Sequence, residues 1–302
     1  MRIVYFDCAA DTAALVAQEP GFFSGIEVHE GSPANEGEII GRLKGADVAI
    51  NGHSYMPAAV LEALAPTLKR IVFLGTGAET YIDMAVADRL GISVEVCRDY
   101  GSRTIAEFAF GLLLDSARKI SRMDRDIRSG NWHVRGGPEL KGKTLGVVGL
   151  GGIGKEMARI GAAFGMNVLA WNRSPLKEEL PVELVSLETV FEKSLAVSLH
   201  VATTPETIGM IGSDLLGRMP EGAILVNVAR GELVDQLALY AALTNGPLGH
   251  AALDVYPEEP LPLDDPIRDF DNVTLTSHAA WNTPDAGRRL LEIGVGLARA
   301  EL

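Results

Sequence analysis

Three side chains that can carry charge or protons follow short apolar segments in the second half of the chain. Arg230 stands in NVARGELVD, Glu259 in LDVYPEEPLP and His278 in TSHAAW. If these segments are parallel strands, ligands bind outside their carboxyl ends, and the three side chains could share one crevice. A histidine can move a proton near neutral pH, and an arginine can grip a carboxylate through two hydrogen bonds. Each residue alone also has an ordinary explanation, as a structural histidine, a loop-capping arginine or a solvated glutamate.

A glycine-rich segment indicates where a dinucleotide could bind. Residues 149–154, GLGGIG, match the pattern GxGxxG and lie between an apolar run, 144–149, and a helical stretch. The pattern alone is a weak signal, but this context strengthens it. Glycines there permit a sharp turn and let the backbone approach a pyrophosphate at the start of the helix. The expected cofactor contacts in this loop are Gly149, Gly151, Gly152, Ile153 and Gly154.

The residue that reads the cofactor ribose is expected about 20 residues further on, at the end of the next strand. Asn172 occupies that position, and Arg173, Ser174 and Lys177 follow it. An aspartate or glutamate is usual where the ribose carries a free 2′-hydroxyl. A neutral asparagine removes repulsion of a 2′-phosphate, and Arg173 could bind that phosphate through two donors. We therefore expect NADP(H), with NAD possible if Arg173 is only a solvated charge and Asn172 bonds a hydroxyl.

Apolar, β-branched runs alternate with amphipathic segments, which is typical of βαβ units and parallel sheets. The expected strands are 2–7, 46–51, 70–75, 92–97, 144–149, 167–172, 195–200, 223–228, 249–255 and 272–277. One long helix is expected over 104–130 and another over the last segment, 284–302. The pattern predicts two α/β domains, residues 1–98 with 285–302 and residues 99–284. The last helix is expected to return to the first domain.

The bulk properties of the 302 residues exclude several classes of protein. A net charge of −13 argues against a nucleic-acid surface, which needs clustered Lys and Arg. No apolar stretch is long enough for a membrane span, and the first residues do not read as a signal peptide. Only Cys8 and Cys97 are present, so no disulfide framework is implied and a reducing cytoplasm fits. We assign no metal-binding residues.

Taken together, the motifs of residues 68–290 resemble the D-isomer-specific 2-hydroxyacid dehydrogenase family, which includes glyoxylate and hydroxypyruvate reductases. The matching segments are LGTGAETYID, TIAEFAFGLLL, GNWHVRGGPELKGKTLGVVGLGGIG, SLHVATTPETIGMI, MPEGAILVNVARGELVD, AALDVYPEEPLP and TSHAAWNTPDA. The resemblance implies two Rossmann-like or flavodoxin-like domains with doubly wound parallel sheets and a cleft between them. The first would bind a small 2-keto or 2-hydroxy acid, and the second would bind NAD(P)H for hydride transfer.

The resemblance also implies roles for single residues. His278 would give a proton to the alkoxide that hydride transfer creates, Glu259 would orient the imidazole and favour its charged form, and Arg230 would hold the substrate carboxylate and polarise the keto oxygen. The expected substrate contacts outside this set are Gly75, Thr76, Gly77, Ala78 and Trp281. The further expected cofactor contacts, beside Arg230 and His278 themselves, are Thr104, Val201, Thr207, Val228, Ala229 and Asp254.

Other functions must be weighed against a reductase. C-terminal binding protein corepressors share a similar HAAW stretch and act as cofactor-sensing scaffolds, and turnover of 2-keto acids would separate them from a reductase. Formate and phosphite dehydrogenases belong to the same superfamily. A methyltransferase with a glycine-rich loop would leave Arg230, Glu259 and His278 unexplained. We further expect a homodimer, because apolar residues of the helix over 104–130, such as Phe108, Phe110 and Leu112 to Leu114, need cover.

Overall fold

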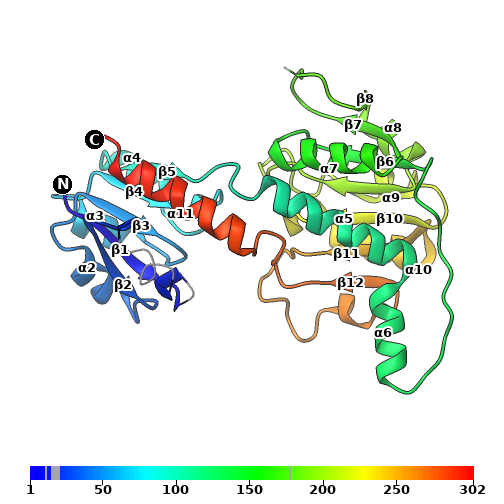
Figure 1. Ribbon diagram of the computed structural model, residues 1–302, viewed down its shortest axis with the longest axis horizontal. Coiled ribbons are helices and arrows are strands. Elements are labelled where there is room, and N and C mark those ends of the chain that lie inside the picture. The colour runs from blue at the N-terminus through cyan, green and yellow to red at the C-terminus, as the bar shows by residue number, and fades with distance from the viewer. Residues whose placement is uncertain (11, 15–20, 177) are drawn as a thin grey trace. The chain divides into compact units, whose positions relative to one another are not determined.

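The computed structural model describes residues 1–10, 12–14, 21–176 and 178–302. The chain divides into two compact units (Figure 1). The first contains Met1–Tyr100 and Thr283–Leu302, and the second contains Gly101–Asn282. The division lies close to the boundaries expected after residues 98 and 284.

The first unit is built on a five-stranded parallel sheet in the order β2-β1-β3-β4-β5. Its strands are β1 (Ile3–Cys8), β2 (Ile26–Glu30), β3 (Val48–Asn51), β4 (Arg70–Phe73) and β5 (Ser93–Val96). The inner strands β1 and β3 are buried throughout, as strands covered on both faces must be. The sequence pattern does not predict β2, because this edge strand has the polar sequence IEVHE and stays partly exposed.

Helices cover this sheet, and the last of them lies near the end of the chain. They are α2 (Glu36–Leu43), α3 (Ala58–Leu64), α4 (Met84–Arg89), the short 3₁₀ helix η1 (Ala78–Thr80) and α11 (Pro284–Arg299). Helix α11, red in Figure 1, packs against β3 and β4, and Arg70 of β4 donates to the carbonyls of Leu297 and Ala300. Helix α11 thus belongs to the same compact unit as β3 and β4.

The second unit has a seven-stranded parallel sheet in the order β12-β11-β10-β9-β6-β7-β8. Its strands are β6 (Thr144–Val148), β7 (Asn167–Trp171), β8 (Glu183–Leu184), β9 (Ala196–Leu199), β10 (Ala223–Asn227), β11 (Leu248–Leu253) and β12 (Val273–Leu275). The strand order reverses between β6 and β9, which is the place where doubly wound sheets bind dinucleotides. The sequence misses only β8 in this sheet, because that strand has just two residues and both are exposed.

Helices lie on both faces of the second sheet and enclose two separate cores. Helices α5 (Ser102–Arg118) and α7 (Gly152–Ala163) pack on one face. Helices α8 (Leu187–Lys193), α9 (Ser213–Gly217) and α10 (Gln236–Asn245) pack on the other. The predicted fold class, two doubly wound parallel-sheet α/β domains, is confirmed. Across the described ranges, no helix is both long enough and apolar enough to cross a membrane.

The prediction of a single helix over 104–130 is wrong. The segment forms two helices, α5 and α6 (Ile120–Arg128), because Lys119 adopts a left-handed backbone with φ of 55°. Asp115 stabilises the break by accepting hydrogen bonds from the backbone N and the Oγ of Ser121, at 2.6 and 2.9 Å. A repeat of apolar residues does not reveal such a break, since both halves keep helical periodicity.

The expectation that the apolar residues of segment 104–130 need cover from a second copy is wrong for its buried members. Phe110, Leu112 and Leu113 are buried in the core between α5, α7 and the sheet of their own unit. Helix α6, in contrast, buries none of its residues. The large apolar side chains exposed on α6 and on the segment after it are Ile120, Ile127, Trp132 and Val134.

Candidate active site

His278 and Glu259 form a close pair in the second unit. The Nδ1 atom of His278 lies 2.6 Å from Oε2 of Glu259, and the backbone N of Tyr256 donates to Oε1 of Glu259 at 2.9 Å. Both side chains remain about one-third exposed, 38% for His278 and 34% for Glu259. The pair is therefore built into the structure and still open to a ligand.

The electrostatics of this pair favour an ionised Glu259. Partial burial raises the pKa of Glu259, but hydrogen bonds from His278 and Tyr256 and the positive charges of His278 and Arg230 outweigh burial, so its pKa lies below the usual value. An ionised carboxylate can only accept, so Nδ1 of His278 carries the shared proton. The other ring nitrogen, Nε2, is left to face a reacting molecule.

Arg230 stands three residues beyond the end of β10, in extended backbone at the start of the 3₁₀ helix η2 (Gly231–Leu233). One guanidinium nitrogen donates to the carbonyl of Ala229 at 2.7 Å. The guanidinium is near enough to Glu259 to lower the pKa of that carboxyl group. The structure thus brings together the three residues that the sequence singles out, at the carboxyl ends of β10, β11 and β12.

Asp254, which the resemblance implies to be a nicotinamide contact, holds the loop that carries His278. Its carboxylate is fully buried and accepts hydrogen bonds from Oγ1 of Thr276 at 2.6 Å and from the backbone N of Ala279 and Ala280 at 3.0 and 2.9 Å. The backbone N of His278 donates to the Asp254 carbonyl at 2.8 Å. These bonds keep His278 in a left-handed conformation, φ 52°, that a non-glycine residue rarely adopts.

The glycine-rich loop has the geometry that a pyrophosphate requires. Gly149 has φ of 95°, and a Cβ there would collide with the His200 backbone and Val201 at 2.8 Å. A Cβ on Gly154 would overlap the Gly149 carbonyl oxygen. Gly151 caps α7 in extended backbone and faces open space, so the bare backbone at the helix start is accessible. The residues present fit a dinucleotide phosphate bound at the start of α7.

The ribose-reading position is tied to this loop. Oδ1 of Asn172 accepts from the backbone N of Leu150 at 2.9 Å, and Nδ2 donates to the Ser174 carbonyl at 2.7 Å. Arg173 is exposed. The pKa of Glu206 is lowered, first by a hydrogen bond from Thr204, with the charge of Arg173 contributing less. Lys177, the remaining residue expected here, lies outside the described residues.

The other expected cofactor contacts lie in or beside the same unit's loops. Val201 touches the turn at Gly149, and Thr207 stabilises its own loop, with its Oγ1 bonded to the Ala202 carbonyl at 2.9 Å and to the Thr204 backbone N at 2.7 Å. Val228 is buried and Ala229 partly buried after β10. Thr104 is buried on α5.

The expected substrate contacts are divided between the units. Gly75, Thr76, Gly77 and Ala78 follow β4 in the first unit, and Trp281, 36% exposed, stands three residues after His278 in the second. The backbone N–H of Gly75 is one of the expected donors to the substrate. It donates to the Phe73 carbonyl at 2.9 Å.

Comparisons with known proteins agree with this architecture. The profile of "D-isomer specific 2-hydroxyacid dehydrogenase, NAD binding domain" matches residues 110–280. A glyoxylate reductase of Korarchaeum cryptofilum is 40% identical over 272 residues, covering 87% of this chain and 81% of the relative. A hydroxypyruvate reductase of Thermotoga maritima is 37% identical over 248 residues, covering 80% of each chain.

A solved structure, the acyclic imino acid reductase Bsp5 in complex with NADPH and D-Arg, superposes with a TM-score of 0.84. It is 30% identical and covers 97% of this chain and 94% of its own. The resemblance found in the sequence is confirmed: the chain belongs to the D-isomer specific 2-hydroxyacid dehydrogenase family, whose reaction moves a hydride between a nicotinamide cofactor and a 2-keto or 2-hydroxy acid.

Proposed function

We propose that this protein reduces a small 2-keto acid of the glyoxylate and hydroxypyruvate type, with Arg230, Glu259 and His278 as its catalytic residues. The observation that carries the proposal is the 2.6 Å pair of His278 and Glu259 with the charge of Arg230 beside it. The names of two relatives, a glyoxylate reductase and a hydroxypyruvate reductase, support this substrate class.

The pairing of His278 with Glu259 determines which ring nitrogen donates the proton. When bound, a reduced nicotinamide would supply a hydride to the keto carbon, which would leave negative charge on the carbonyl oxygen. His278 donates a proton from Nε2 to that oxygen, because Glu259 engages Nδ1 and fixes the ring. In the reverse direction neutral His278 removes the hydroxyl proton. Glu259 stays ionised in both directions, because its pKa lies below the usual value.

Arg230 binds the substrate carboxylate. Its planar guanidinium can donate two parallel hydrogen bonds to a carboxylate and can polarise the keto oxygen next to it. This role explains how a chain with a net charge of −13 binds a small anion, since one arginine concentrates positive charge at the site. The loop of Thr76, Gly77 and Ala78 would add backbone donors, and Trp281 would contact the substrate side chain.

The proposed cofactor is NADPH in preference to NADH. Asn172 places no negative charge at the ribose-reading position, and exposed Arg173 follows it directly. A 2′-phosphate would therefore meet a guanidinium rather than a carboxylate. Solved relatives are named for complexes with either cofactor, NADPH in one and NAD in two others, so the proposed preference depends on Asn172 and Arg173.

We further propose a cytoplasmic homodimer. The exposed apolar side chains of α6 and of the following segment, including Ile127 and Trp132, would be covered by a second copy. Cys8 and Cys97 are buried and are not joined in a disulfide, which is ordinary in a reducing compartment. Light scattering that finds a stable monomer at micromolar concentration would contradict the dimer.

The experiment that tests the reductase is a substrate panel. Glyoxylate, hydroxypyruvate, pyruvate and a branched 2-keto acid are each assayed with NADPH and with NADH. Formate and phosphite are assayed with both oxidised cofactors. We expect turnover of the smallest keto acids and none of formate or phosphite. Cofactor binding without turnover of any keto acid would instead favour a cofactor-sensing scaffold.

A further inference from the structure

Asn227, the last residue of β10, grips the backbone that carries Arg230. Its side chain is 1% exposed. Nδ2 donates to the carbonyl of Arg230 at 2.8 Å, and Oδ1 accepts from the backbone N of Ala229 at 3.0 Å. Both ends of one buried amide are thus used on two adjacent residues, and the second of these is the proposed substrate clamp.

A strand-end asparagine also makes two hydrogen bonds to nearby backbone in the first unit. Asn51 ends β3, is fully buried, and bonds Ser54 in both directions, from Nδ2 to the carbonyl at 2.9 Å and from the backbone N to Oδ1 at 3.1 Å. In each case an asparagine at a strand end holds the chain three residues later. Short side-chain amides are suited to such local backbone bonds.

The segment after Arg230 is held by backbone hydrogen bonds and by one close backbone contact. The N–H of Gly209 donates to the Glu232 carbonyl at 2.8 Å, and the N–H of Ile211 donates to the Leu233 carbonyl at 3.0 Å. A Cβ on Gly231 would overlap the backbone of Tyr256 and Pro257, so these two loops touch without any side chain between them. Tyr256 is also the residue whose N–H holds Glu259. The contact at Gly231 therefore links the backbone of Arg230 to the backbone that positions Glu259.

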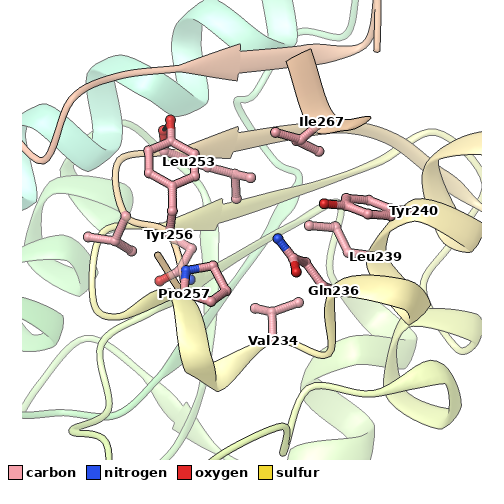
Figure 2. Close-up of a pocket in the computed structure, with 11 residues that line it drawn as sticks. Val234, Gln236, Leu239, Tyr240, Leu253, Tyr256, Pro257 and Ile267 are labelled. Atoms are coloured by element: carbon pink, nitrogen blue, oxygen red, sulfur yellow. Dashed lines mark hydrogen bonds between the residues drawn. The ribbon is translucent and has the colours of Figure 1, made fainter. Parts of the chain in front are cut away.

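Beside this contact is a small cavity of about 20 Å³, lined in part by Asn227, Gly231, Tyr256 and Pro257. Figure 2 shows it with Tyr256 and Pro257 on one side and Leu239 and Tyr240 of α10 on the other. A cavity provides no contacts to resist movement of the segment towards it. The two hydrogen bonds of Asn227 fix the backbone of Ala229 and Arg230 where the chain leaves β10, and the N–H of Leu233 adds a longer bond to the Arg230 carbonyl, at 3.4 Å.

We propose that Asn227 is a positioning residue, which sets the guanidinium of Arg230 for the substrate carboxylate through its two backbone hydrogen bonds. This inference rests on the proposed role of Arg230 in substrate binding. Displacing a binding group by about 1 Å can cost about a hundredfold in rate. Asn227→Ala should therefore lower kcat/KM for glyoxylate by about that factor while the fold is kept.

The test compares Asn227→Ala and the milder Asn227→Ser, whose hydroxyl is shorter than the amide, with a matched control. The control is Asn272→Ala, which removes another amide donor of the same unit, the 3.1 Å bond from Nδ2 of Asn272 to the Leu243 carbonyl. The measurements are kcat and KM for glyoxylate, inhibition by oxalate, the Kd of NADPH and the urea midpoint. We expect both Asn227 variants to weaken inhibition by oxalate and to raise the KM for glyoxylate. The Kd of NADPH should stay within about twofold of wild type, a smaller change than the loss of one hydrogen bond to the cofactor would cause.

A double-mutant cycle with Arg230→Ala separates positioning from a general loss of stability. If Asn227 acts through Arg230, adding Asn227→Ala to Arg230→Ala should cost little further activity. Additive losses, or an Asn227 variant that behaves like Asn272→Ala, would overturn the inference and leave the proposed function standing. Unchanged oxalate inhibition in Arg230→Ala alone would overturn the role of Arg230 itself, and the inference with it.

Discussion

Asp254 and His278 are joined through the backbone, by a 2.8 Å hydrogen bond from the N–H of His278 to the carbonyl of Asp254. The Asp254 carboxylate meanwhile binds the residues on either side of His278, at Thr276, Ala279 and Ala280. One buried residue thus shapes the loop that presents the proton donor. The left-handed conformation of His278 depends on it.

We predict that Asp254→Asn destabilises the second unit. The amide would turn one acceptor oxygen into an N–H group facing backbone N–H donors, and a buried unsatisfied group costs about 1–3 kcal/mol. Urea unfolding should show a lower midpoint, and kcat should fall because the His278 loop is less fixed. Wild-type stability in this variant would mean that the carboxylate does not hold the loop.

The second prediction concerns cofactor choice. Arg173→Ala should weaken NADPH about ten- to a hundredfold and leave NADH nearly unchanged, since a charge-assisted hydrogen bond contributes about 1.5–3 kcal/mol. Asn172→Asp should shift preference the same way by repelling a 2′-phosphate. Titration of both cofactors by fluorescence or calorimetry measures this. A wild-type protein that binds NADH better than NADPH would refute the proposed preference.

The third prediction is that Arg230→Lys is not a mild change. Lysine keeps the charge but loses the planar fork, and its ammonium group cannot match both carboxylate oxygens together. We expect kcat/KM to fall by orders of magnitude while cofactor affinity changes little. Near-normal kcat/KM in this variant would show that Arg230 is not the substrate clamp.

The fourth prediction is acid lability caused by a buried histidine. Burial, with nearby positive charges, lowers the pKa of His250 to about 4, and the side chain is 5% exposed. Because the folded-state pKa lies below the unfolded value, the unfolded chain binds the extra proton, and stability is lost as pH falls from about 6.5 towards 4. For this one group the loss is of the order of 3 kcal/mol at pH 4.

His250→Gln isolates that contribution, because every other titrating group is shared with wild type. The glutamine keeps a polar side chain near Oγ1 of Thr274, which His250 contacts through Nε2 at 3.0 Å. Unfolding free energies measured from pH 7 to pH 4 should fall less steeply in the variant. Parallel curves would mean that His250 is charged or accessible in the folded protein.

The sequence predicts the strand ends and the glycine-rich loop because both depend on local patterns. Arg230, Glu259 and His278 can be predicted because each lies a few residues beyond the end of a strand, at Asn227, Leu253 and Leu275. The role of Asn227 could not be found this way, since an asparagine at a strand end signals a turn in general, and only the structure shows which backbone it holds. The break at Lys119 was missed because it depends on Asp115 reaching Ser121 across the turn.

The most direct test of the proposed mechanism is the pH dependence of kcat/KM in both directions for wild type and Glu259→Gln. Glutamine keeps the shape of the side chain but removes the negative charge that lies 2.6 Å from Nδ1 of His278, and a neighbouring negative charge in general stabilises a cation. Reduction needs His278 protonated and oxidation needs it neutral. We therefore predict that the alkaline limb of reduction and the acidic limb of oxidation both move to lower pH in the variant. Limbs that stay in place, with activity intact, would contradict the pairing of Glu259 with His278 as the source of the proton.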